Sequence, residues 1–179
     1  PAALKALMSS GEVRVSGLLC PGHVTTIIGT AAYDFIPAEF GLPCAVTGFE
    51  PVDMLLGIES ILRQIKEGHA FVDNVYTRAV RVPANPRARE LLAEVFAPDD
   101  ARWRGLGTIL GSGVKIRQPY ARFDARARFP QVWERLTPPP PSPCRCGEVL
   151  RGVRRPAECP LFAGICTPAQ PLGPCMVSS

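Results

Sequence analysis

The sequence lacks the features of several protein classes. No apolar run approaches the roughly 20 residues that cross a bilayer, so a transmembrane segment is not expected. Histidine is scarce, with 2 among 179 residues, and no Ser–His–Asp set and no Cys-x-x-Cys redox pair can be identified. No internal repeat is visible. The common hydrolase and thiol oxidoreductase patterns are therefore absent.

The composition is that of a folded protein with a modest charge. Hydrophobic residues make up 46% of the chain and charged residues 20%, which is typical of a packed core and argues against disorder. A net charge of +4 is too weak to indicate nucleic-acid binding by itself. The first residue is Pro1 and the opening residues resemble the end of a helix, so we expect a chain cut out of something longer.

Cysteine is unevenly distributed. Of the 7 cysteines, only Cys20 and Cys44 lie in the long N-terminal part, and the others follow position 143. A disulfide-stapled secreted fold would spread an even number through the chain. We therefore expect a reducing, cytoplasmic compartment.

The first part of the chain alternates between strand and helix patterns. Residues 13–19 and 43–49 read as short strands, and a helix is expected to start just after Pro21-Gly22. A helix beginning at Pro51 and ending at Gly68 follows the second strand, with apolar Leu55, Ile58, Leu62 and Ile65 on one face and polar Asp53, Glu59, Arg63 and Lys66 on the other. Another amphipathic helix, carrying Ala88, Leu91, Leu92, Val95 and Phe96, is expected after Asn85-Pro86. This rhythm predicts a parallel α/β sheet.

In parallel sheets, ligands bind beyond the carboxyl ends of the strands. Here those ends are Cys20–His23 and Gly48–Pro51, and both turns should open on the same edge. His23 could act there as an acid–base group or ligand, and Glu50 could line the same cleft. A core histidine and a helix-capping glutamate are the simpler alternatives.

The middle of the chain changes character. The glycine run 105–113 fits neither phosphate-loop template and reads as glycine-punctuated strand. Arginines interleaved with aromatics over 102–128 suit a solvated face or a docking surface for an acidic partner better than nucleic acid. We expect an α/β domain over 1–136, a proline-rich linker over 137–143 and a cysteine-rich module over 144–179.

The module is the most specific feature of the sequence. Gaps of twelve, six and eight residues separate Cys146, Cys159, Cys166 and Cys175, and a gap of one residue separates Cys144 from Cys146. Soft thiolates gathered in this way favour iron–sulfur clusters or zinc. The paired knuckles of zinc ribbons are missing, and long gaps suit a cluster wrapped by loops. The cysteines could instead bind zinc, form disulfides or remain unligated. The chain could also be an α/β enzyme in which the cysteines have no role.

The motifs together resemble the HypD family of NiFe-hydrogenase maturation proteins. They run in family order as Cys20–Gly29 (CPGHVTTIIG), Gly48–Gly57 (GFEPVDMLLG), Trp103–Gly107 (WRGLG), Cys146–Gly152 (CGEVLRG), Glu158–Phe162 (ECPLF) and Gly173–Ser179 (GPCMVSS). The resemblance implies a partial Rossmann-like parallel-sheet domain, followed by a small loop-rich module that holds a 4Fe–4S cluster. Carried over by motif, three of the cluster ligands are Cys146, Cys159 and Cys166.

The resemblance also implies a function. Family members assemble the Fe(CN)2CO centre of NiFe hydrogenase, as a scaffold and electron donor rather than a conventional turnover enzyme. They share the iron with a HypC-type chaperone and receive cyanide through a HypE-type protein. The family's N-terminal iron-binding and dithiol motifs are missing here, so the chain is expected to be a C-terminal fragment. The family's fourth cluster ligand would lie beyond Ser179; Cys175 and Cys144 are not family ligands, and Cys175 is a weak substitute.

Overall fold

A computed structural model describes residues 2–103, 105–135 and 142–176. The chain divides into two compact units, one made mainly of Ala3–Met8 with Val15–Ala93 and the other mainly of Ser9–Arg14 with Glu94–Ser179. The expected domain limits, 1–136 and 144–179, stay predictions. Most of the expected linker 137–143 lies outside the described residues. None of the helices in the described part of the chain is long and apolar enough to cross a membrane.

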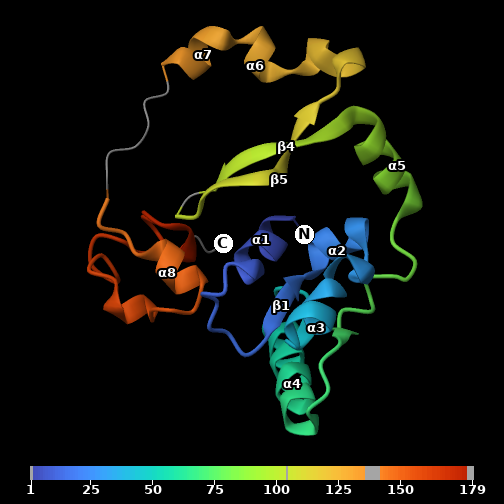
Figure 1. The fold of residues 1–179 in the computed structure, drawn as a ribbon, viewed down its shortest axis with the longest axis vertical. Helices are drawn as coiled ribbons and strands as arrows, with labels where there is room; N and C mark the ends of the chain where they lie inside the picture. The colour runs from blue at the N-terminus through green and yellow to red at the C-terminus, as the bar shows by residue number, and fades with distance from the viewer. Residues whose placement is uncertain (1, 104, 136–141, 177–179) are drawn as a thin grey trace. The chain divides into compact units, whose positions relative to one another are not determined.

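The first unit has the strand and helix alternation that the sequence predicts (Figure 1). Its elements follow a short N-terminal helix, α1 (Ala2–Ser9), and are β1 (Leu18–Pro21), α2 (Gly22–Ile28), the 3-10 helix η1 (Thr30–Tyr33), α3 (Phe35–Phe40), β2 (Cys44–Thr47), α4 (Pro51–Glu67), β3 (Val72–Asn74) and most of α5 (Pro86–Val95). The expected strand at 13–19 is displaced, because only its last two residues belong to β1. The short strand β3 was not predicted.

The three strands form a parallel sheet in the order β1-β2-β3. Pro21 pairs with Thr47 in this register, so the carboxyl ends of β1 and β2 lie side by side. The prediction that both turns open on one edge is therefore confirmed. The mixed α/β fold class is confirmed as well.

The core of the first unit surrounds β2, which is buried along its whole length. Cys44 and Val46 pack with Tyr33 and Ile36 on one face of the sheet, and Cys20 of β1 joins this cluster. Side chains alternate between the two faces of a strand. Thr47 therefore points toward the opposite face, where its hydroxyl oxygen lies 3.5 Å from the Met54 sulfur of α4 and donates to the Gly48 carbonyl at 2.7 Å.

Helix α4 has the predicted bounds. Pro51 occupies its first turn, and Gly68 closes it with φ +66°, a conformation that favours glycine. The predicted spacing is confirmed, but the apolar stripe does not face the sheet: Leu55, Ile58, Leu62 and Ile65 are 66, 44, 60 and 47% exposed. The buried residues are instead Asp53, Gly57, Ser60 and Gln64.

Hydrogen bonds explain why the small and polar face of α4 is buried. Ser60 donates to Asp73 at 2.6 Å. Gln64 donates to the Cys44 carbonyl at 3.2 Å and accepts the Phe71 N–H at 2.9 Å. At Gly57 a Cβ would lie 2.2 Å from the Thr47 side chain. The expectation that Asp53 lies on the solvated face was wrong, because the helix approaches the sheet on this side.

The second unit opens with an antiparallel hairpin of β4 (Phe96–Trp103) and β5 (Gly107–Ile116). The glycine-punctuated strand was predicted correctly, but its partner was not. Phe96 was placed on the preceding helix and instead pairs with Ile116. The predicted start of α5 is confirmed, since the Asn85 side chain accepts the Ala88 N–H at 3.0 Å. Short helices follow: η2 (Gln118–Phe123), α6 (Ala125–Arg128), α7 (Pro130–Glu134), α8 (Cys146–Leu150), η3 (Pro156–Glu158) and η4 (Pro174–Met176).

Candidate functional site

Two glycines, Gly22 and Gly48, allow the strand-end turns of the first unit to pack closely against Tyr76 and Asp53. A Cβ on Gly22 would lie 2.4 Å from the Tyr76 ring, and a Cβ on Gly48 would lie 2.1 Å from an Asp53 carboxylate oxygen. Both glycines are buried. Tyr76 and Asp53 therefore fill the space behind the turns, and a side chain at either glycine would displace them.

An ion pair closes this edge. The Arg78 guanidinium donates to both Asp53 carboxylate oxygens at 2.6 Å and to Glu50 at 3.2 Å. It also lies over the Tyr76 ring, 4.5 Å from the centroid. Hydrogen bonds from Arg78 hold the pKa of Asp53 below its usual value. Sequence reasoning missed Arg78, because an arginine in a loop carries no pattern that names its partner.

The two cleft candidates lie on this edge with different contacts. His23 is the second residue of α2; it is exposed, and its ring lies 5.2 Å from the Phe49 ring. Glu50 precedes α4, but its side chain pairs with Arg78 instead of capping the helix. Their use in chemistry stays a prediction.

Cys20 and Cys44 belong to the core of the first unit. Both are buried, 3 and 0% exposed, on neighbouring strands. Their hydrogen bond, followed by burial, raises the pKa of the Cys20 thiol. A buried thiol of this kind behaves as a small apolar side chain. These residues therefore fit packing and not a metal site.

The second unit gathers the C-terminal cysteines, and Cys159 is the one whose thiol has a lowered pKa. Nearby backbone groups, those of Arg145 and Leu161 first, lower the pKa of this thiol. Hydrogen bonds to the charged form of an acid stabilise that form. The loop after η3 thus presents a sulfur suited to binding metal.

Cys166 and Cys146 are more deeply buried, each 4% exposed. The Leu172 N–H donates to the Cys166 sulfur at 3.3 Å, and the Cys166 N–H donates to the Leu161 carbonyl at 2.9 Å. Cys146 begins α8, where burial, and then its neighbour Cys144, raise the pKa of its thiol to about 11.

Cys144 and Cys175 complete the group. Burial, then the charge of Cys144, raises the pKa of Cys175, with smaller effects from Cys166 and Cys159. Hence the other four C-terminal cysteines lie within electrostatic reach of Cys175. We define residues 142–176 as the thiol module.

Charged residues hold the first helix of the thiol module. Glu148 accepts hydrogen bonds from Arg154 at 2.7 Å and from Arg145 at 3.2 Å, and these bonds lower its pKa. Arg151 donates to its own helix at the Gly147 carbonyl and pairs with Glu12. Arg145, whose backbone lowers the pKa of Cys159, is thereby fixed beside α8.

The thiol module lacks the geometry of a simple metal-ion site. Within residues 2–103, 105–135 and 142–176, no group of three or more His, Cys, Asp or Glu side chains is arranged to hold a metal ion. The three cysteines predicted as ligands are brought into one module but do not converge on one point.

Comparison with known proteins covers the whole chain. The family model HypD, described as the hydrogenase formation hypA family, matches residues 1–179. A hydrogenase maturation factor HypD2 of Bradyrhizobium diazoefficiens is 43% identical over 100% of this chain and 48% of its own length. Hydrogenase maturation factors HypD of Cupriavidus necator and Escherichia coli are each 41% identical, over 100 and 98% of this chain and 48 and 47% of their own lengths. The chain thus spans about half the length of these relatives.

A family match over every residue agrees with the order of the motifs along the chain. The matched region includes both the strand-end edge and the thiol module. The chain belongs to the HypD family of hydrogenase formation proteins.

Proposed function

We propose that this chain contributes to the maturation of NiFe hydrogenase by holding a 4Fe–4S cluster in its thiol module. Cys146, Cys159 and Cys166 would be ligands. The observation that carries the proposal is the gathering of free thiols in the thiol module, with Cys146 and Cys166 each 4% exposed and the pKa of Cys159 lowered by nearby backbone groups. Such backbone groups stabilise a thiolate and tune the potential of a bound cluster.

The residues fit an iron–sulfur cluster better than a single zinc ion. A structural zinc site needs four ligands around one point, whereas each thiolate of a cluster binds a different iron atom. The long gaps between Cys146, Cys159 and Cys166 provide no paired knuckles of the zinc-ribbon kind, so the spacing favours the cluster. Cys175 is the weak candidate for a fourth ligand within the described residues, because only one residue separates Cys144 from Cys146.

The proposal extends to the role of the whole protein. When bound, the cluster would supply electrons while the Fe(CN)2CO centre is assembled with a HypC-type chaperone and a HypE-type cyanide-delivery protein. The Rossmann-like first unit would serve as a scaffold. The chain would be a C-terminal fragment of the whole maturation protein. His23 and Glu50, on the strand-end edge, would line the route between partners.

Anaerobic reconstitution with iron and sulfide tests the cluster. We expect a brown protein with iron–sulfide signals in Mössbauer or EPR spectra. Replacing Cys159 by Ser should remove most of the iron, whereas Cys20→Ala, which removes a core thiol of the first unit, should leave it. A colourless protein that binds one zinc ion would establish the alternative, a zinc-stabilised interaction module without a redox role.

A further inference from the structure

Two glycines, far apart in the sequence, contact the Cys146 region of the second unit. Gly105 lies in the turn of the β4–β5 hairpin, where a Cβ would stand 2.8 Å from the Cys146 sulfur and 3.1 Å from the Gly147 nitrogen. In return, a Cβ on Gly147 would stand 2.2 Å from the Gly105 carbonyl oxygen. The backbone of the hairpin turn therefore lies directly against the start of α8.

Gly173 makes a second contact of this kind. A Cβ there would lie 2.6 Å from the Cys144 sulfur, 2.9 Å from the Cys146 Cβ and 3.5 Å from the Cys146 sulfur. Gly173 is buried and directly precedes η4. The sulfur atoms of Cys144 and Cys146 are thus packed against the backbone of the segment that carries Cys175.

A real Cβ at either glycine would force the cysteines to move. Separations below 3.0 Å are essentially never seen for Cβ atoms. The atoms this close are the sulfurs of Cys146 and Cys144 and the Cys146 Cβ, which lie within two bonds of the backbone and can yield little without moving it. Cys146 itself is only 4% exposed. The close approach of the two glycine backbones accounts for part of this burial.

We propose that Gly105 and Gly173 are positioning residues that fix the Cys146 sulfur, with the β4–β5 turn as its cover. Without side chains, the two backbones approach closely enough to exclude solvent and to hold one sulfur orientation. The packing role does not depend on the proposed function. The statement that this packing prepares a cluster ligand rests on the proposed function. The hairpin would then serve to protect this thiol.

The chain offers a matched control for each glycine. Gly107 closes the same hairpin with φ +79°, against +80° for Gly105, but a Cβ on Gly107 would meet nothing within 4 Å. Alanine at either position carries the same left-handed strain. For Gly173 the control is Gly164, where the nearest atom to a Cβ would be the Leu161 carbonyl oxygen at 3.9 Å.

Site-resolved alkylation of the metal-free chain tests the proposal. Iodoacetamide labelling is followed by mass spectrometry, and Cys166, equally buried at 4% in the same unit, is the internal reference. In Gly105→Ala and Gly173→Ala we expect the Cys146 rate, relative to the Cys166 rate, to rise about tenfold, because overpacking raises the population of locally opened states. Gly107→Ala and Gly164→Ala should leave the ratio within about twofold of wild type.

Other outcomes would overturn the positioning role. An unchanged ratio in both test variants would show that neither glycine restrains Cys146. A ratio that rises equally in Gly107→Ala would assign the effect to turn strain. A variant in which Cys166 labelling rises as much as Cys146 labelling is loosened throughout, which also contradicts a local role.

Iron content separates this inference from the proposed function. If wild-type chain takes up no iron on reconstitution while the alkylation ratio responds as expected, the cluster proposal fails and the positioning role stands. If the chain takes up iron but the alkylation ratio does not respond, the cluster proposal stands and the positioning role fails.

Discussion

Arg78 donates two parallel hydrogen bonds to Asp53, from Nη1 to Oδ1 and from Nη2 to Oδ2, each 2.6 Å long. The Asp53 side chain is 3% exposed and that of Arg78 is 53% exposed, so the carboxylate is buried and the guanidinium reaches solvent. Such two-point pairing fixes both position and orientation. It links the first turn of α4 to the segment after β3, and thus shapes the strand-end edge.

Replacing Asp53 by Asn is expected to destabilise the first unit in a pH-dependent way. The folded pKa of Asp53 is lowered, so its contribution is present above the unfolded value of about 3.9 and is lost as pH falls through the folded pKa. Urea unfolding of both proteins should show a clear difference at pH 7 that shrinks toward pH 3.

Glu90→Gln is the matched control for this variant. It removes a carboxylate from the Arg87–Glu90 pair, whose side chains are 70 and 65% exposed. Exposed pairs contribute little, so stability should change by less than about 0.5 kcal/mol. A difference between Asp53→Asn and wild type that is constant from pH 7 to pH 3 would contradict the role of the ionised pair.

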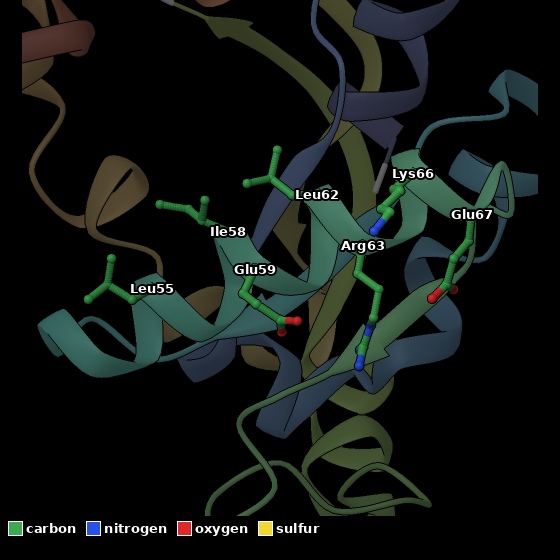
Figure 2. A pocket seen from close by; sticks show the side chains of 7 residues that line it. All are labelled: Leu55, Ile58, Glu59, Leu62, Arg63, Lys66 and Glu67. Carbon is green, nitrogen blue, oxygen red and sulfur yellow. The ribbon is translucent and has the colours of Figure 1, made fainter.

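Substitutions on the two faces of α4 should change the free energy of unfolding by different amounts. Gly57→Leu pushes a side chain into Thr47 and should lower the free energy of unfolding by about 1–3 kcal/mol. Leu55 and Leu62 lie with Ile58 on the exposed stripe shown in Figure 2. The double variant Leu55→Ser, Leu62→Ser should therefore change the free energy of unfolding by less than about 1 kcal/mol. Thermal unfolding followed by circular dichroism measures both. Greater loss in the double serine variant would mean that the stripe is part of the core.

Gln64 should be a stabilising polar residue despite its burial. It is 1% exposed and bonds the Cys44 carbonyl and the Phe71 N–H, so Gln64→Leu removes both hydrogen bonds and takes the side-chain acceptor away from the Phe71 N–H. We expect a loss of about 1–3 kcal/mol in urea unfolding. Gln131→Leu, on an exposed face of α7, is the control and should be near neutral. Equal effects would indicate that the hydrogen bonds contribute nothing.

The thiols of the module should differ in their pH profiles. The pKa of Cys159 is lowered by nearby backbone groups, whereas that of Cys146 is raised to about 11. Only the thiolate reacts with alkylating agents. In the metal-free chain, Cys159 should react faster than Cys146 at pH 7, and Cys146 should accelerate with each step up to pH 10. Site-resolved mass spectrometry would detect this, and identical profiles would show that the backbone groups do not act on Cys159.

Local sequence signals located most of the first unit. Pro51 and Gly68 marked the ends of α4, and Asn85 marked the start of α5, because caps and breakers act within a few residues. The strand before Pro21 was displaced, since residues 13–17 have an extended pattern but no partner strand to pair with in the described sheet.

The thiol module was recognisable from spacing and motif, but its contacts were not. Nothing in the sequence indicates that the Arg145 backbone lowers the pKa of Cys159, or that Gly105 lies against Cys146 from 41 positions away. These contacts depend on how loops fold over one another. Periodicity and composition carry no information about such distances.

The sequence by itself determined the family, the alternation of strands and helices, and which cysteines are grouped, because these depend on residue type and on neighbours along the chain. Only the tertiary structure decided that α4 packs through Asp53, Gly57, Ser60 and Gln64 and leaves its apolar stripe exposed. Hydrophobic spacing shows that a helix has two faces. Which face is buried depends on the hydrogen bonds and close contacts that the opposing strands offer.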